Sequence, residues 1–245
     1  MQDRYVGDIG DYVKLSILRA IMPGRRLGVA WWLFPDEDHN SDGVHIAYLD
    51  EAARWRSFDP DLFDRLRKVV TAGERRVEAL QHADVLPGGV YCDDRIPTTG
   101  TPGQRMLARE QWFRRVQSRV SGCDLVFIDP DNGLETKRFN SGASKAGKSV
   151  SLAELQALRS PERTLIVYHH HTRMKGGHHH ELEHWGERLR GAGFLTVDAL
   201  RASAYSARAF FILDASHGVR HRAEQIAARW GERLLTWHPR LGSLV

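Results

Sequence analysis

The sequence has few cysteines and no long apolar run. Its 245 residues include two cysteines, Cys92 and Cys123, which form no CxxC pair. Such a sparse set predicts neither a disulfide framework nor a zinc ribbon and is typical of a reducing compartment. No apolar stretch approaches the roughly 20 residues of a membrane span, and the N-terminus lacks the apolar core of a signal peptide. We therefore expect a cytoplasmic protein that has no membrane partner.

The chain also lacks a strong excess of either acidic or basic residues. Lysine and arginine number 35 against 31 acidic residues, which gives a formal net charge of +4. The resulting pI of about 9.2 permits a polyanionic partner such as nucleic acid, but a solvated arginine-rich surface gives the same balance. The hydrophobic fraction is 42%, which over this length supports a sizeable core and argues against disorder.

Helix and strand signals alternate along the chain. Helical spacing of apolar residues or capping patterns predict helices over 11–22, 59–70, 102–120, 151–158, 178–190 and 220–234. Apolar runs predict strands over 27–34, 88–96, 123–128, 163–168, 194–202 and 207–215. This alternation predicts a single Rossmann-like α/β domain over 1–245 with a mostly parallel sheet. The last two strands are expected to form a C-terminal antiparallel hairpin, a known variation of methyltransferase-type sheets.

Two further segments stand out from this frame. Residues 1–24 form an N-terminal segment that carries a motif and leads into the first helix. Residues 136–150 are a polar stretch rich in glycine, serine and lysine, a composition that predicts a mobile loop.

Polar clusters follow three of the predicted strands. Asp129, Pro130, Asp131 and Asn132 come after 123–128; His169 to His171 come after 163–168; an acidic stretch that includes Asp36 comes after 27–34. Aspartate and asparagine favour turns, so one such cluster has a purely structural explanation. Because ligands bind at the carboxyl ends of parallel strands, three clusters at one sheet edge predict a site there.

The cluster after 123–128 resembles the Asp/Asn-Pro-Pro-aromatic motif of amino-methyltransferases. Asp129 and Pro130 match its first half, whereas Asp131 and Asn132 stand where that motif has its second proline and its aromatic residue. In that family the acidic or amide side chain and a backbone carbonyl accept hydrogen bonds from the target amine. The resemblance therefore implies a catalytic role for Asp129, with Asp131 and Asn132 beside it.

The stretch VGDIGDYVKLSIL near the N-terminus resembles the RlmJ-like family, adenine-N6 methyltransferases of large-subunit ribosomal RNA. That family begins with Gly-Asn-x-x-Asp-x-x-Lys before a helix, near the methyl donor and the target base. Gly7, Asp8, Asp11 and Lys14 fall at these spacings, with Asp8 in place of asparagine. The resemblance implies an S-adenosylmethionine-dependent methyltransferase-like fold in which Gly7, Asp8 and Asp11 bind the cofactor and Lys14 helps to organise the reaction. A group of bacterial proteins that share GDIGD, DPDNGLE and a VYHH strand end is similar too.

The turn after the first strand lacks the glycines of the usual S-adenosylmethionine loop. It contains one glycine, Gly43, and several carboxylates. Carboxylates are poor partners for the methionine carboxylate of the donor, but an acidic side chain such as Asp36 suits ribose hydroxyls. The cofactor is therefore S-adenosylmethionine bound in another manner, a different cofactor, or none.

Histidines crowd the segment from His169 to His184. Arg173 and Lys175 lie within it, and with His169 and His171 they form a candidate contact to phosphate or nucleic acid. His180 and His184 are four residues apart on one predicted helix face, a spacing that suits a divalent metal as well as an ordinary surface.

Three functions remain open on the sequence alone. The leading one is a methyltransferase that acts on a nucleic acid or nucleotide with S-adenosylmethionine. The second is a metal-dependent hydrolase or nuclease that uses Asp and Glu oxygens together with His180 and His184. The third is a non-catalytic nucleic-acid-binding module on a degenerate methyltransferase fold. Oligomeric state is not predicted by any of these patterns.

Overall fold

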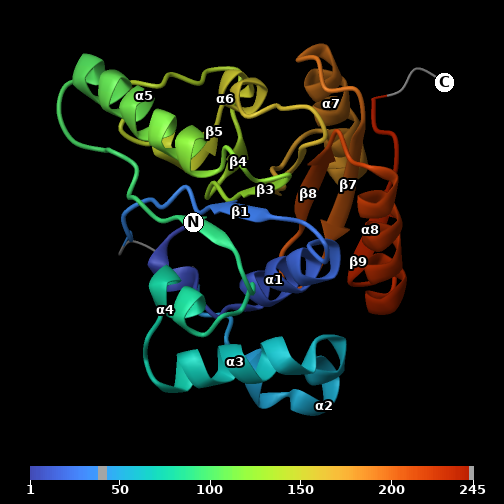
Figure 1. The fold of residues 1–245 in the computed structure, drawn as a ribbon. Coiled ribbons are helices and arrows are strands. Elements are labelled where there is room, and N and C mark those ends of the chain that lie inside the picture. Colours follow the sequence, from blue (N-terminus) through green and yellow to red (C-terminus); the bar gives the residue numbers. More distant parts are fainter. Residues whose placement is uncertain (38–42, 243–245) are drawn as a thin grey trace.

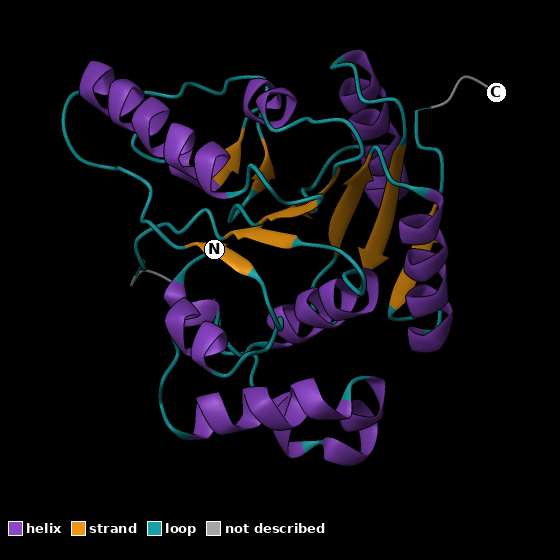
Figure 2. Ribbon diagram, in the orientation of Figure 1, coloured by secondary structure: helices purple, strands orange, loops and turns teal. Residues whose placement is uncertain are grey.

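A central β-sheet organises the computed structural model, which describes residues 1–37 and 43–242 (Figure 1). Within these residues the strands lie in the order β2-β1-β3-β6-β8-β7-β9 (Figure 2). Their bounds are Leu27–Ala30 for β1, Val90–Cys92 for β2, Leu125–Ile128 for β3, Thr164–His170 for β6, Val197–Ala202 for β7, Arg208–Leu213 for β8 and Leu235–His238 for β9. A separate small pair joins β4 (Gly133–Leu134) to β5 (Ser149–Val150).

The register confirms the expected α/β class. Strands β2, β1, β3 and β6 pair in parallel. The hairpin of β7 and β8 then folds back so that β8 pairs antiparallel with β6 and with β7. Because β8 runs opposite to β6, it begins at the edge where the parallel strands end, with Arg208 beside His170. The fold is therefore Rossmann-like with the predicted closing hairpin.

Helices cover both faces of the sheet (Figure 1). Those packed in one apolar cluster are α1 (Ile9–Ile21), α3 (Pro60–Thr71), α4 (Val77–His82) and α8 (His217–Trp230). Those packed in the other are α5 (Pro102–Arg119), α6 (Leu152–Ala157) and α7 (Gly177–Gly191). The short helix α2 (Ala52–Trp55) precedes α3. Alternation along β3 explains the two clusters, since Phe127 faces the first and Val126 the second.

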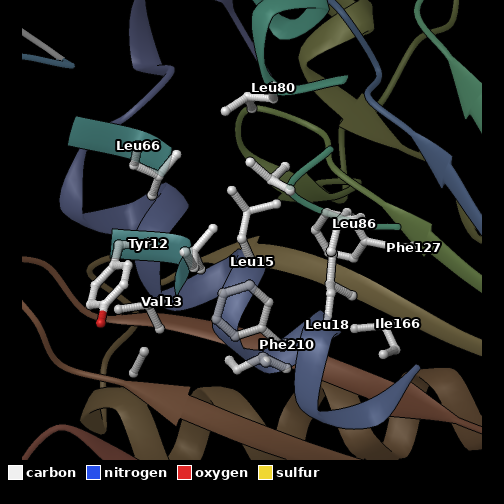
Figure 3. Packing of buried hydrophobic residues seen from close by; sticks show 14 of the residues in the cluster. Tyr12, Val13, Leu15, Leu18, Leu66, Leu80, Leu86, Phe127, Ile166 and Phe210 are labelled. Carbon is white, nitrogen blue, oxygen red and sulfur yellow. The ribbon is translucent and has the colours of Figure 1, made fainter. Parts of the chain in front are cut away.

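Helix α1 is buried on two sides. Leu15 and Leu18 pack with sheet residues Phe127 and Ile166, while Tyr12 packs with α3 (Figure 3). This position explains why apolar residues occur almost all round the helix instead of along one stripe. It also places the start of α1 at the sheet edge that carries the polar clusters.

Four segments differ from the sequence expectation. Strand β1 ends at Ala30, not at residue 34, because Trp32 has a φ of 50° and the chain leaves the ladder. The predicted mobile loop 136–150 ends in a 3-10 turn (Ala146–Lys148) and in β5, which pairs with β4. Helix α4 and strand β9 were not predicted, since both are short and their apolar pattern is weak. Among the described helices, none has the length and apolar character needed to cross a bilayer.

Candidate functional site

A cavity of about 410 Å³ opens at the sheet edge where the parallel strands end. Its lining comes from the start of α1, the turn after β3, the end of β6 and the start of β8. Asp129, Asp131 and Asn132 all line it, as do Lys14 and Asp11. The structure thus brings together two motifs that lie more than 100 residues apart in the sequence.

Lys14 links the two motifs. Its Nζ donates hydrogen bonds to Oδ1 of Asp11 at 2.7 Å and to Oδ2 of Asp129 at 2.6 Å. The three side chains are only 5%, 0% and 3% exposed. The ammonium group also lies 5.8 Å from the ring of Trp31 and 5.9 Å from that of Tyr168. Helical spacing puts Asp11 and Lys14 on one face of α1, while β3 delivers Asp129 from the sheet.

Charge within this triad is unequal, because two carboxylates share one ammonium. Burial raises the pKa of Asp129, and it raises the pKa of Asp11 as well. Burial by itself would lower the pKa of Lys14, but the two carboxylates outweigh it and hold that pKa above its ordinary value. Lys14 is therefore charged, and the three ionised side chains together carry one net negative charge, which faces the Met1 amino group as well as the cavity.

The N-terminal motif builds the start of α1. Asp8 is the N-cap, and its Oδ1 accepts from the backbone nitrogen of Asp11 at 2.9 Å. Oδ2 of Asp11 accepts from the backbone nitrogen of Gly7 at 3.1 Å. Gly7 has a φ of 78°, and a Cβ there would lie 2.4 Å from a methyl group of Val70. The motif residues therefore fix Asp11 and Lys14 in place; Asp8 lines the cavity, whereas Gly7 does not.

Asp131 lies deeper than its turn position suggests. Its side chain is 3% exposed, and Oδ2 accepts from Nε2 of Gln2 at 2.5 Å and pairs with Nζ of Lys148 at 3.3 Å. Burial by itself would raise the pKa of Asp131, but the Met1 amino group, Gln2 and Lys148 together hold it below its ordinary value. Asn132, by contrast, is exposed at the cavity edge.

The crevice between the ends of β1 and β3 is filled by the chain itself. The amino nitrogen of Met1 donates a hydrogen bond to the carbonyl oxygen of Asp129 at 2.6 Å. The same nitrogen lies 3.4 Å from the carbonyl oxygen of Trp32. In open α/β sheets this switch point between neighbouring strands is the usual nucleotide crevice. The cavity therefore lies beside the crevice, toward β6 and β8. Asp36, in the turn after β1, lies outside the cavity, and its side chain accepts a hydrogen bond from the backbone nitrogen of Arg4. Residues 38–42 of the same turn lie outside the described residues.

His169 and His171 are placed differently from the prediction. Both are buried, and both face Glu181 of α7, at 3.3 Å from Nε2 of His169 and 3.0 Å from Nδ1 of His171. Glu181 also accepts from the backbone nitrogen of Thr172 at 3.0 Å and from its hydroxyl at 2.7 Å. Side chains that are held this way cannot reach a phosphate in solution. They anchor the loop after β6 to α7 instead.

The remaining histidine-segment residues stay near the surface. Arg173 and Lys175 are exposed, as the phosphate prediction requires. His180 is exposed and His184 is half-buried against Trp185. In the part of the chain that the structure describes, no three histidine, cysteine, aspartate or glutamate side chains are arranged to hold a metal ion.

Sequence reasoning missed several residues of the cavity. His45, Tyr168 and Arg208 line it, and so does His170, which the sequence placed in the histidine cluster after 163–168 but to which it gave no role of its own. A signal for Arg208 existed, because it is the charged first residue of a strand that is otherwise apolar. In an antiparallel hairpin that strand must begin at the carboxyl edge of its parallel neighbour. His45 gave no signal, since the segment before it follows no periodic pattern.

Comparison with known proteins adds no family to this geometry. No protein-family model matches the sequence, and no curated protein matches it.

Proposed function

We propose that the protein is a methyltransferase that acts on an amine of a nucleic acid or nucleotide, with S-adenosylmethionine as the donor. The observation that carries this proposal is the position of Asp129. Its carboxylate follows β3 directly, lines the cavity and engages Lys14 through Oδ2. Within the described residues Oδ1 is left for a ligand. The Rossmann-like sheet with its closing hairpin supports the same choice.

The residues of the cavity fit the donor. Four carboxylates line it (Asp8, Asp11, Asp129 and Asp131) against three cationic groups, which are the Lys14 and Arg208 side chains and the Met1 amino group. This excess of negative charge suits the sulfonium and the ammonium group of S-adenosylmethionine. The cavity volume also lies within the range of about 300–1,000 Å³ that is usual for small-molecule sites. Asp8, beside the triad, is the residue that would hold the donor, whereas Asp131 is already engaged by Gln2 and Lys148.

When bound, the donor supplies an electrophilic methyl group. Asp129 accepts a hydrogen bond from the target amine through Oδ1, which orients the nitrogen lone pair for attack. Lys14 holds that carboxylate in one orientation from the opposite oxygen. Because burial raises its pKa, Asp129 takes up the amine proton more readily than an exposed aspartate does. Pro130 restricts the backbone after Asp129 and so fixes the direction of the turn.

The surface around the cavity suits a polyanionic substrate. The exposed His170 lines the cavity together with the buried Arg208, and the chain continues from His170 to the exposed Arg173 and Lys175. Both cysteines are free thiols, which fits an enzyme of the cytoplasm.

Donor binding can be measured by calorimetric titration of metal-stripped protein with S-adenosylmethionine in chelator. We expect binding without metal, and no change when Mg²⁺, Mn²⁺ or Zn²⁺ replaces the chelator. The matched comparison is S-adenosylhomocysteine, which lacks the sulfonium charge and is expected to bind more weakly to this acidic cavity. Binding of a metal ion in the absence of any donor binding would favour the hydrolase alternative and contradict the proposal.

A further inference from the structure

Arg208 is a buried cation that forms no ion pair with the described residues. It is the first residue of β8, is 7% exposed and lines the cavity. Its one hydrogen bond within the described residues joins Nη2 to the hydroxyl of Ser206 at 2.5 Å. Its Nε is buried without any partner, and no described carboxylate forms an ion pair with it. Every other arginine with less than one tenth exposure is satisfied differently: Arg109 by Glu154 and Arg163 by four backbone carbonyls.

Such an arrangement is unfavourable unless an anion completes it. Buried guanidinium groups are almost always paired or fully hydrogen-bonded, because removing a charge from water is costly. We propose that Arg208 binds a phosphate of the nucleotide substrate. The missing partner is then supplied from the cavity, through the planar donor fork that favours phosphate and carboxylate oxygens.

The start of α1 supplies a second group of donors at the same point. Gly10 lines the cavity, and a Cβ added there would lie 2.0 Å from Nη1 of Arg208 and 3.0 Å from Oδ1 of Asp8, the N-cap. Only glycine therefore lets the guanidinium reach the first turn of the helix. The backbone nitrogens of Ile9 and Asp11 donate to the His45 carbonyl and to Asp8, whereas Gly10 has no such acceptor among the described residues. Its N–H and the positive end of the helix dipole favour an anion beside Arg208.

The position of Arg208 favours the substrate over the donor as the source of this anion. Strand β6 separates β8 from β3, and the β1–β3 crevice lies on the far side of Asp129. The rim near Arg208 carries Tyr205, which is 54% exposed, and its ring lies 5.2 Å from that of His45. Exposed aromatic rings beside a phosphate site are suited to stacking on a base. The identity of the anion as a nucleotide phosphate rests on the proposed function, whereas the anion site itself rests on Arg208.

The test compares adenosine 5′-monophosphate, adenosine and inorganic phosphate in calorimetric titrations of the wild-type protein and the Arg208→Met variant. We expect the variant to bind the monophosphate about 10- to 100-fold more weakly, the range for a lost hydrogen bond to a charged group, and to bind adenosine unchanged. The matched control is Arg201→Met on the neighbouring strand β7, which lies outside the cavity and should bind both probes as the wild type does.

Thermal unfolding of the same variants separates a binding role from a structural one. Because Arg208 lacks an ion pair, Arg208→Met should keep or raise the melting temperature. A fall of several degrees would overturn the proposal, and so would unchanged binding of the monophosphate or a wild type that binds neither it nor phosphate. Loss of S-adenosylmethionine binding alone would assign Arg208 to the donor carboxylate and also overturn it. Monophosphate binding that depends on Arg208, in a protein that binds no donor, would leave this inference standing while the methyltransferase proposal failed.

Discussion

Replacing Lys14 by methionine is expected to lower the free energy of unfolding by about 3–5 kcal/mol, the cost of leaving buried charges without a partner. Methionine fills much of the same volume, so the loss reports the charge and not a cavity. The variant leaves Asp11 and Asp129 facing each other across the site, and both carboxylates are almost fully buried. Chemical denaturation followed by tryptophan fluorescence measures the change.

The pH dependence of this loss distinguishes charge from packing. Burial already raises the pKa of Asp11 and Asp129 in the folded protein. Without Lys14 both pKa values rise further, so the folded state loses stability as the pH rises above the unfolded value near 3.9. The loss should therefore be smaller at pH 5 than at pH 8. The exposed Lys68 on α3 provides the control, since Lys68→Met should change stability by less than about 0.5 kcal/mol. An equal loss for Lys14→Met at both pH values would show that the triad is not held by charge.

Replacing Glu181 by alanine is expected to cost about 3 kcal/mol or more, because one buried carboxylate accepts hydrogen bonds from three residues. His169, His171 and Thr172 all lose their acceptor in the variant. Burial by itself would raise the pKa of Glu181, but these hydrogen bonds outweigh it and lower that pKa. Glu187→Ala, on the exposed side of the same helix α7, is the matched control. If both variants unfold at the same denaturant concentration, the buried cluster does not anchor the loop after β6.

The same cluster gives the wild-type protein a pH-dependent stability. Burial lowers the pKa of His171 to about 4, so the folded state favours the neutral ring. The unfolded chain takes up a proton near pH 6.5, and stability contributed by His171 is therefore lost as the pH falls from 6.5 toward 4. Denaturation at pH 7.5, 6 and 5 should show this decline in the wild type and a smaller one in His171→Gln.

The sequence predicted the central part of the site because two strong patterns converge there. The apolar run before Asp129 identified β3, and the helical pattern around Lys14 identified α1. In a parallel sheet the end of β3 and the start of α1 both lie at the carboxyl edge. The fold class therefore predicts that Asp129 and Lys14 lie near each other. The direct contact between Lys14 and Asp129 could not be predicted, since it depends on how far α1 is inserted between the sheet and α3.

Residues outside these patterns were harder to place. His169 lies near the end of β6 and His171 directly follows the strand, and both side chains face Glu181 instead of solvent. No local pattern shows which face of β6 a helix covers, so burial of these histidines was not foreseen. Arg208 carried a signal as the charged first residue of an apolar strand, but its contacts in the cavity depend on the register of the folded sheet. Tertiary packing, and not local propensity, decides each of these cases.

The central claim is that the protein transfers a methyl group to an amine that Asp129 orients and deprotonates. One measurement tests this claim most directly. Wild-type protein and Asp129→Ala are incubated with S-adenosylmethionine labelled in its methyl group and with oligoribonucleotides and mononucleotides, and label transferred to the nucleic acid is counted. Asp124→Ala, at the opposite end of β3, is the control. We predict transfer by the wild type and by the control, and a loss of at least about 100-fold in Asp129→Ala, the usual minimum for a positioned proton acceptor. Transfer by Asp129→Ala at the wild-type rate, or its absence in the wild type with every substrate, would contradict the account.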